Sequence, residues 1–266
     1  KFKIMIIWIA SYPKSGNTWV RTFISTYYFS NETKFNFKFL KYIRQFPHEK
    51  FFKHKIHNIN SAIENWDNAQ KEINKDGIKK FLKTHSALAK INNFPFTSKQ
   101  NTIASIYIVR DPRNIITSIS NHYNLNFDEA IKFMTNKKKF LLNNQDINNF
   151  GNFTFLNSWS EHYKSWLNNK EFETLFIKYE NLQANSIIYF KQIIQFINRI
   201  LKRNEEIDEE RVKEIVKSIS FDVLSKKEQN EGFPEAVKID GNKKKKFFYL
   251  GKKNNWREIF NPEQIE

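Results

Sequence analysis

Residues 6–24 read Ile-Ile-Trp-Ile-Ala-Ser-Tyr-Pro-Lys-Ser-Gly-Asn-Thr-Trp-Val-Arg-Thr-Phe-Ile, an apolar segment followed by a short polar loop and an amphipathic segment. The pattern predicts a buried strand over residues 4–10 and a helix over residues 18–29. The first backbone N–H groups of a helix lack intrahelical partners, and the helix dipole is positive at that end. With Gly16 for close approach and Lys14 for charge, this P-loop-like unit predicts a site for phosphate or another anion.

The order of residues in this loop separates it from the nucleotide triphosphatases. Their loops place the lysine after the second glycine and follow it with a Ser or Thr that holds magnesium. Here Lys14 and Ser15 precede the only glycine of the loop. We expect Asn17 and Thr18 to cap the helix and Trp19, in its first turn, to stack on a base. The alternative is an ordinary strand-turn-helix unit that binds no ligand.

The length and composition favour one domain over residues 1–266 with a sizeable core. The chain is 40% hydrophobic and contains 27 phenylalanines, so it has ample material for that core. It has no cysteine, which excludes disulfides, thiolate metal sites and cysteine nucleophiles and is compatible with a reducing compartment. Its longest N-terminal apolar run, residues 4–10, is too short to cross a membrane. We therefore expect a cytoplasmic protein.

The net charge of +16 predicts attraction to polyanions or to acidic small molecules. The lysines are scattered through segments that are also rich in Asn and Ile, which favours a solvated lysine surface over a nucleic-acid-binding face. A nucleic-acid-binding protein is the rival hypothesis from another class. It would concentrate basic residues on one face with aromatic residues between them, and its binding would depend steeply on salt.

Candidate strands and helices alternate along the rest of the chain. The expected strands are residues 77–85, 102–109 and 174–179, and the expected helices are 153–168, 185–201, 209–218 and one starting at Asn114. Trp159 and Trp166 are expected in the core. Residues 31–80 show no clear period, and residues 137–151 are expected to form a mobile surface insertion. The alternation predicts a central, mainly parallel sheet flanked by helices, with ligands at the carboxyl ends of its strands.

Four groups of charged or polar residues follow the ends of these strands: Lys14, the Lys83-Thr84-His85 group, Arg110 and Tyr179. In a parallel sheet these ends meet at one edge, so we expect the groups to lie together. Arg110 can hold a phosphate through two hydrogen bonds, and Ser118 lies two turns along the helix that follows.

A histidine at this edge is the candidate proton acceptor. A neutral imidazole suits the removal of a proton from a hydroxyl near pH 7, which makes His85 the first candidate and His122 the competing one. A structural role is the alternative for each. No Asp, Glu and His cluster has the spacing of a metal site, and no apolar strand ends in a lone carboxylate that could hold magnesium. Lys, Arg and backbone amides would then neutralise a charged donor, and a P-loop kinase is the less favoured enzyme class.

These motifs together resemble the cytosolic-type sulfotransferases, which use 3′-phosphoadenosine 5′-phosphosulfate (PAPS) and release 3′-phosphoadenosine 5′-phosphate (PAP). The similarity is collinear over nearly the whole chain. Residues 12–19 resemble the family's phosphosulfate loop, 83–85 its Lys-x-His motif, 109–118 its 3′-phosphate motif, 176–182 its adenine-contacting strand, and Ser220, Phe221 and Leu224 its nucleoside pocket.

The resemblance implies a direct in-line transfer without a metal. It implies that His85 takes the acceptor proton, that Lys14 stabilises the leaving oxygens and that Lys83 holds the sulfuryl oxygens. The implied donor-binding residues are Lys14, Ser15, Gly16, Asn17, Thr18, Trp19, Arg110, Ser118, Tyr179, Ser220, Phe221 and Gly251. Within this set Arg110 and Ser118 bind the 3′-phosphate, and Trp19 and Phe221 enclose the adenine with Tyr179 at its edge.

The C-terminal motif departs from the family pattern Arg-Lys-Gly-x-x-Gly-x-Trp. Gly251 and Trp256 match, but Tyr249 and Leu250 stand at the two basic positions. Residues 243–246 or 252–253 could supply the missing charge, or they could be a solvated lysine run. This departure keeps open a non-catalytic, nucleotide-binding relative. The resemblance predicts a small-molecule or glycan acceptor, shaped by residues 31–80 and 125–149, and neither a nucleic-acid partner nor a membrane span.

Overall fold

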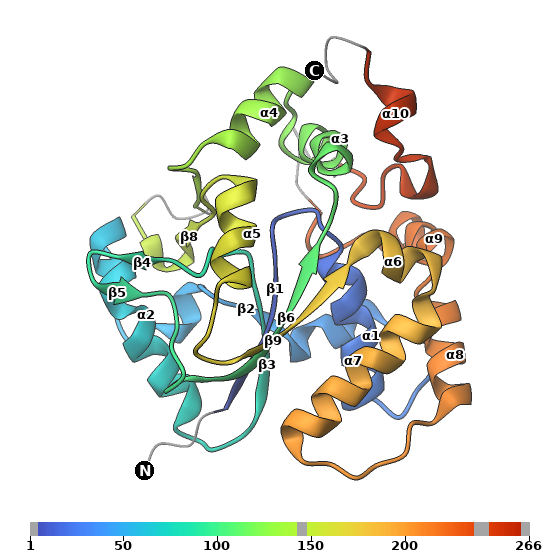
Figure 1. Ribbon diagram of the computed structural model, residues 1–266, viewed down its shortest axis with the longest axis horizontal. Helices are drawn as coiled ribbons and strands as arrows, with labels where there is room; N and C mark the ends of the chain where they lie inside the picture. Colours follow the sequence, from blue (N-terminus) through green and yellow to red (C-terminus); the bar gives the residue numbers. More distant parts are fainter. Residues whose placement is uncertain (1–4, 143–147, 237–244, 262–266) are drawn as a thin grey trace.

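A parallel sheet forms the centre of the molecule. The computed structural model describes residues 5–142, 148–236 and 245–261. The sheet has five strands in the order β2 (Arg44–Gln45), β3 (Lys80–Thr84), β1 (Ile6–Ser11), β6 (Thr102–Val109) and β9 (Glu173–Lys178). Each neighbouring pair is parallel, so the carboxyl ends of the strands lie at one edge (Figure 1). The expected α/β fold with a mainly parallel sheet is confirmed.

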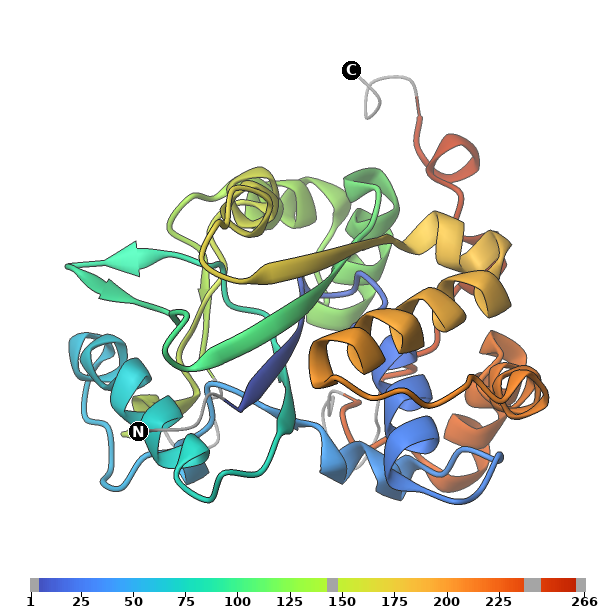
Figure 2. The ribbon, with the colours of Figure 1, turned by 60° about the horizontal axis from the view of Figure 1, so that its bottom comes forward.

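Helices cover both faces of the sheet (Figures 1 and 2). On one face α1 (Asn17–Phe29), α7 (Ser186–Leu201) and α8 (Glu209–Ser218) pack in a core with Ile7 and Ile9 of β1. On the other, α2 (Ile59–Asn74) and α5 (Trp159–Leu167) pack with Ile6, Trp8 and Ala10. Successive side chains of a strand point to opposite faces, so both sets on β1 are buried, and the strand is apolar from Ile6 to Ala10.

A third group of elements lies beyond the carboxyl edge. It contains α3 (Pro112–Tyr123), α4 (Phe127–Thr135) and α10 (Trp256–Ile259), which share a small apolar core. The remaining elements are the strands β4 (Lys90–Ile91), β5 (Phe94–Pro95), β7 (Phe140–Leu141) and β8 (Thr154–Phe155), the helices α6 (Tyr179–Ala184) and α9 (Phe221–Glu231), and the 3-10 helices η1 (Phe37–Tyr42), η2 (Glu49–Phe51), η3 (Phe150–Asn152) and η4 (Gly251–Lys253).

The strand expected over 102–109 and the helix expected over 209–218 have the expected bounds. The strand expected over 77–85 is shorter, Lys80–Thr84, and His85 comes directly after it. The helix expected from Asn114 begins two residues earlier, at Pro112, because Asp111 caps it by accepting the N–H of Arg113.

The helix expected over 153–168 is wrong in its first third. Helix α5 begins at Trp159, where Ser158 accepts the N–H of Glu161, and Thr154 and Phe155 instead pair with β7. The aromatic spacing before Trp159 therefore reflects packing of a short strand. Trp166 is buried as expected, whereas Trp159 is only partly buried.

Helix α2 lies in the stretch that was expected to lack a period. Its buried residues are Ala62, Ile63, Trp66, Ala69, Gln70, Ile73 and Asn74, a spacing of three and four that is typical of an amphipathic helix. Asn58 caps it by accepting the N–H of Ser61. The insertion expected over 137–151 lies in part outside the described residues, at 143–147, and its described part contains β7 and the start of η3.

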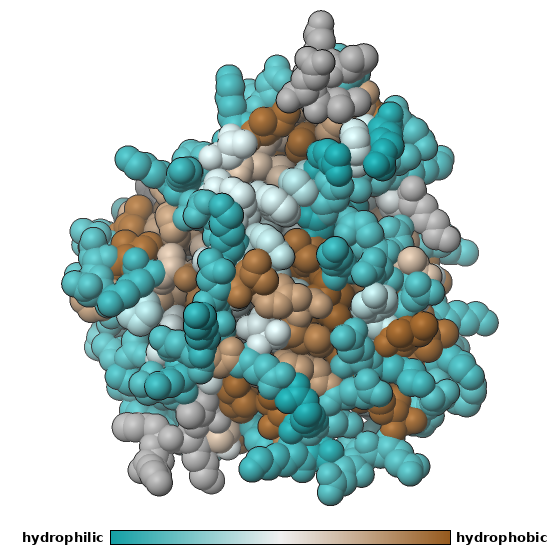
Figure 3. Space-filling view, in the orientation of Figure 1, coloured by the Kyte–Doolittle hydropathy of each residue, from teal (hydrophilic) through white to brown (hydrophobic). Residues whose placement is uncertain are grey.

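The face seen in Figure 3 is mostly hydrophilic, as the abundance of lysine predicts, with hydrophobic side chains gathered near its middle. No helix in the described ranges is long and apolar enough to cross a membrane.

Candidate functional site

A cavity of about 540 Å³ opens at the carboxyl edge of the sheet. Its walls come from the loops after β1, β3 and β6, from the helices α3, α6 and α9, and from residues 247–254. The predicted site residues on its lining are Lys14, Gly16, Asn17, Thr18, Trp19, Lys83, His85, Arg110, Ser118, Tyr179, Ser220, Phe221 and Gly251. Ser15 is not on the lining, and its buried hydroxyl has no hydrogen-bond partner. The structure thus brings together residues that are far apart in the sequence.

The N-cap of helix α1, beside this cavity, is a glycine and no side chain caps the helix. Gly16 is the N-cap of α1 with φ 98°, and its carbonyl accepts the N–H groups of Trp19 and Val20. The expectation that Asn17 and Thr18 cap the helix is wrong. The Asn17 side chain turns back to donate to the Ile9 carbonyl at 3.0 Å and the Ser11 hydroxyl at 3.3 Å, so it ties the loop to β1.

Gly16 also meets a steric requirement. Its φ is in the left-handed region, and a Cβ atom there would lie 2.5 Å from the Tyr179 ring. The missing side chain lets the loop pack directly on Tyr179, which is the first residue of α6.

Lys14 is the cation at the centre of the loop. Its backbone is left-handed, with φ 66°, and its ammonium is buried without a hydrogen-bond partner, 3.6 Å from the centroid of the Phe247 ring. Burial, and then the charges of Lys83 and Arg110, lower the pKa of Lys14 to about 7. A buried ammonium without an anionic partner is costly, so this position suits an incoming anion.

Arg110 provides a second buried cation. Its Nη1 donates to the Lys14 carbonyl at 3.0 Å, its guanidinium lies 4.3 Å from the centroid of the Tyr179 ring, and its buried Nε has no partner. Burial lowers its pKa. Ser118 of α3 and the partnerless indole N–H of Trp19 border the same space. Hydrogen-bond donors without partners therefore surround the cavity: the Lys14 ammonium, the Arg110 Nε and the Trp19 indole N–H.

His85 is held in one tautomer. Its Nδ1 lies 2.8 Å from the Ser11 carbonyl, which can only accept, so Nδ1 carries the proton and Nε2 keeps its lone pair. Burial, and then the charge of Lys83, lower its pKa well below the ordinary value. The imidazole is thus a neutral acceptor near pH 7. His122 lines the same cavity, and burial with the charges of Lys14 and Lys83 lowers its pKa to about 3.

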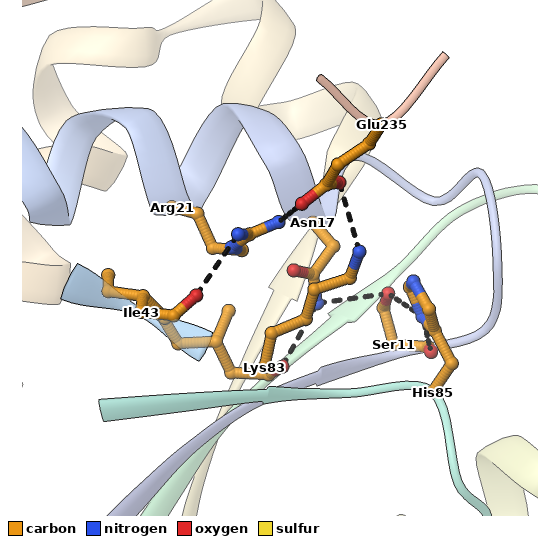
Figure 4. A network of polar contacts seen from close by, with 8 residues as sticks. Ser11, Asn17, Arg21, Ile43, Lys83, His85 and Glu235 are labelled. Carbon is orange, nitrogen blue, oxygen red and sulfur yellow. Dashed lines mark hydrogen bonds and ion pairs between the residues drawn. The ribbon is translucent and has the colours of Figure 1, made fainter. Parts of the chain in front are cut away.

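A carboxylate that the sequence interpretation missed joins this group. Glu235 reaches into the cavity from the segment after α9, and lies 2.7 Å from Arg21 of α1 and 3.1 Å from Lys83 (Figure 4). Burial alone would raise the pKa of Glu235, but Arg21 and Lys83 hold it well below its usual range. No local sequence pattern marks this residue.

The C-terminal segment forms a further wall, fixed by buried polar contacts. The Glu228 carboxylate accepts the backbone N–H groups of Phe247 and Phe248 at 2.7 and 3.0 Å. The Asn254 side chain donates to the Asn114 carbonyl and accepts from Thr117. These contacts set residues 247–254 across the cavity.

Tyr249 and Leu250, which stand at the family's two basic positions, both line the cavity. Gly251 packs against Phe221: a Cβ atom on Gly251 would lie 2.5 Å from the Phe221 ring. Lys245 instead donates to the Asn124 side chain at 2.8 Å, away from the lining. Residues 243–244 lie outside the described part of the chain.

Among the described residues, no group of three or more His, Cys, Asp or Glu could hold a metal ion. The cationic side chains on the cavity lining are those of Lys14, Lys83 and Arg110.

The family model for the sulfotransferase domain matches residues 6–266. The chain belongs to the sulfotransferase family. It is 23% identical to cytosolic sulfotransferase 17 of Arabidopsis thaliana over 262 residues, which cover 97% of this chain and 70% of the relative. It is 24% identical to sulfotransferase 1A1 of Rattus norvegicus over 259 residues, covering 97% and 80%. Flavonol 3-sulfotransferase of Flaveria bidentis is 23% identical, with 98% and 78% covered.

Solved structures agree at the level of the fold. The crystal structure of retinol dehydratase in a complex with retinol and PAP aligns with a TM-score of 0.59 at 18% identity, covering 100% of this sulfotransferase and 79% of that chain. The chain is accordingly a distant member that keeps the family's architecture.

The buried charge of Lys14 leads to a prediction about stability. Below pH 7 the folded protein pays the full cost of the buried ammonium, and this cost disappears as pH rises toward the unfolded value near 10.5, because the unfolded chain then binds more protons. We expect Lys14→Met to raise the free energy of unfolding by about 1–4 kcal/mol at pH 6. The gain should shrink steadily up to pH 9.5.

Urea unfolding at several pH values measures this difference. Lys164→Met, at a side chain that is 60% exposed, is the control and should change little. A gain for Lys14→Met that did not depend on pH would contradict the buried charge.

Proposed function

We propose that this sulfotransferase transfers a sulfuryl group from PAPS to a hydroxyl or amine of a small-molecule or glycan acceptor. The observation that carries the proposal is one cavity whose lining combines the partnerless ammonium of Lys14, the partnerless Nε of Arg110 and a histidine, His85, fixed as a neutral base. Its volume of about 540 Å³ suits a nucleotide. The structural neighbour in complex with PAP supports this choice of donor.

Each end of the donor has a place in this arrangement. Lys14 and the N-terminal amides of α1 would hold the 5′-phosphosulfate, with Ser15, Gly16, Asn17 and Thr18 forming the loop around it. Arg110 and Ser118 would hold the 3′-phosphate. We assign the nucleoside to the walls formed by Trp19, Tyr179, Ser220, Phe221 and Gly251. Because Tyr179 lies against the Arg110 guanidinium, it also supports that side chain.

The proposed reaction is a single displacement at sulfur. Nε2 of His85 takes the proton from the acceptor hydroxyl or amine, whose oxygen or nitrogen forms the new bond to sulfur. The bond between sulfur and the bridging oxygen breaks, and its electron pair leaves with PAP. Lys14 stabilises the charge that develops on the leaving oxygen, and Lys83 lies near the sulfuryl oxygens.

The acceptor end of the cavity is assigned to the two segments expected to vary. Gln45 of β2 and Leu141 of β7 come from residues 31–80 and 125–149, and both lie on the cavity lining. A flavonol sulfotransferase and a retinol complex among the similar proteins support a small organic acceptor. We further propose that residues 1–266 act as one domain and that the protein is cytoplasmic, as the name of the plant relative suggests.

Selective binding of the donor product tests the first half of this proposal. PAP should bind at least about tenfold more tightly than adenosine 5′-phosphate, since a hydrogen bond to a charged group contributes about 1.5–3 kcal/mol. Arg110→Ala should remove most of that preference. Titration calorimetry with the two nucleotides measures it.

The control for this experiment is Arg113→Ala, three residues along, whose exposed guanidinium pairs with Asp111. It should keep the preference for PAP. Equal affinity of the wild-type protein for both nucleotides would remove the 3′-phosphate site.

Loss of the proposed base tests the chemistry. His85→Asn should lower kcat by about 10²–10⁴, the usual contribution of general base catalysis, and leave PAP affinity near wild type. Because burial lowers the pKa of His85, the wild-type rate should still be constant as the pH is lowered past 6.5, and should fall only at more acidic pH. Label transfer from ³⁵S-PAPS to a panel of phenols, alcohols and aminosugars measures both effects.

The control for this variant is His48→Asn, at a histidine that does not line the cavity. A folded His85→Asn protein that binds PAP and transfers sulfate at the wild-type rate would refute the assignment and favour His122.

A further inference from the structure

Glu235 connects three separate parts of the fold at the cavity. Its Oε1 pairs with Arg21 of α1 and its Oε2 with Lys83 of β3, while its own segment follows α9 (Figure 4). Arg21 is fixed on the other side, because its Nη2 donates to the Ile43 carbonyl at 3.0 Å. The carboxylate is therefore held at both oxygens, with 30% of the side chain exposed at the cavity.

Lys83 needs such a partner. Its side chain is only 9% exposed, and burial and the charge of Arg21 both lower its pKa, whereas Glu235 raises it. Among the described residues, the other titratable groups that interact with Lys83 are Lys14, His85 and His122. All three are cations or neutral bases. The nearby Glu228 carboxylate is occupied by the backbone of residues 247–248.

Two other roles for Glu235 fit the structure poorly. A general base needs a carboxylate that binds protons readily, but two cations stabilise the charged form of this one. A binding site for a cationic acceptor needs free oxygen atoms and a negative surrounding. Both oxygens of Glu235 are paired, and Lys14, Lys83 and Arg21 would repel an ammonium.

We propose that Glu235 is a positioning residue for sulfuryl transfer: its carboxylate, 3.1 Å from the Lys83 ammonium, holds that group in place on the cavity lining that it shares with His85. This inference rests on the proposed function, because Lys83 is useful there only if it meets the sulfuryl oxygens. Arg21 serves as the anchor that ties the carboxylate to α1. The same contacts hold the segment after α9 against β3 and α1, so one carboxylate connects the helix that follows the Lys14 loop, the strand that precedes His85 and a wall of the cavity.

A double-mutant cycle with Lys83 tests the proposal, using Glu235→Gln, Lys83→Gln and the double variant. Glu235→Gln should lower kcat about 10- to 100-fold, because Lys83 loses charge or orientation at the reacting group. It should change the Kd for PAP by less than about threefold, since PAP lacks the sulfuryl group. In the Lys83→Gln background the same change should cost almost nothing, because the two residues act as a unit.

The pH profile supplies a readout that a purely structural role would not move. Without Glu235 the Lys83 ammonium loses its proton at a lower pH, so the alkaline fall of kcat should begin earlier in Glu235→Gln. Glu235→Asp retains the charge and should recover part of the rate. Glu231→Gln is the matched control: this glutamate pairs with Lys227 at the surface, and its loss should leave rate and profile unchanged.

Each outcome decides the question. Costs of Glu235→Gln and Lys83→Gln that multiply in the double variant would refute the proposal, as would a rise in acceptor KM alone. If Glu235→Gln does not fold, the double variant, which removes the pair together, and Glu235→Asp carry the test. If the double variant transfers sulfate at the wild-type rate, the Glu235–Lys83 pair is not needed for transfer, which overturns this inference and leaves the proposed function standing. Failure of the wild-type protein to transfer sulfate refutes both.

Discussion

Three cationic side chains are buried together at one edge of the sheet, and the cavity is built around them. Lys14, Lys83 and Arg110 are each buried at the carboxyl ends of parallel strands, where their charge is expensive. The fold offsets this cost in part with Glu235, with the Phe247 ring and with the Tyr179 ring. An anionic nucleotide can accept hydrogen bonds from the groups that remain unpaired. Their burial lowers the stability of the free protein, and the same groups would then contribute to its affinity for PAPS.

Much of this edge could be predicted because its residues are placed by local sequence. A buried strand followed by a loop and a helix has a strong pattern, and parallel strands bring their ends together. Lys14, His85 and Arg110 therefore follow from the order of elements alone, and the structure places them on one cavity. Identity near 23% to the relatives leaves these motifs recognisable.

The rest depends on contacts that the sequence does not encode locally. Glu235 gains its place only because the segment after α9 returns to α1, more than two hundred positions away in the chain. The cap of α1 was mispredicted because Asn17 finds better partners on β1 once the loop turns at Gly16. Helix α2, in contrast, had a visible period that the abundant aromatic residues around it obscured.

A crystal structure of the protein with PAP would show directly whether these cations receive the donor. We expect the 5′-phosphate within about 3 Å of the Lys14 ammonium and the first amides of α1, and the 3′-phosphate at the same distance from Arg110 and Ser118. A nucleotide bound outside this cavity, or one whose phosphates leave Lys14 and Arg110 without partners, would contradict it.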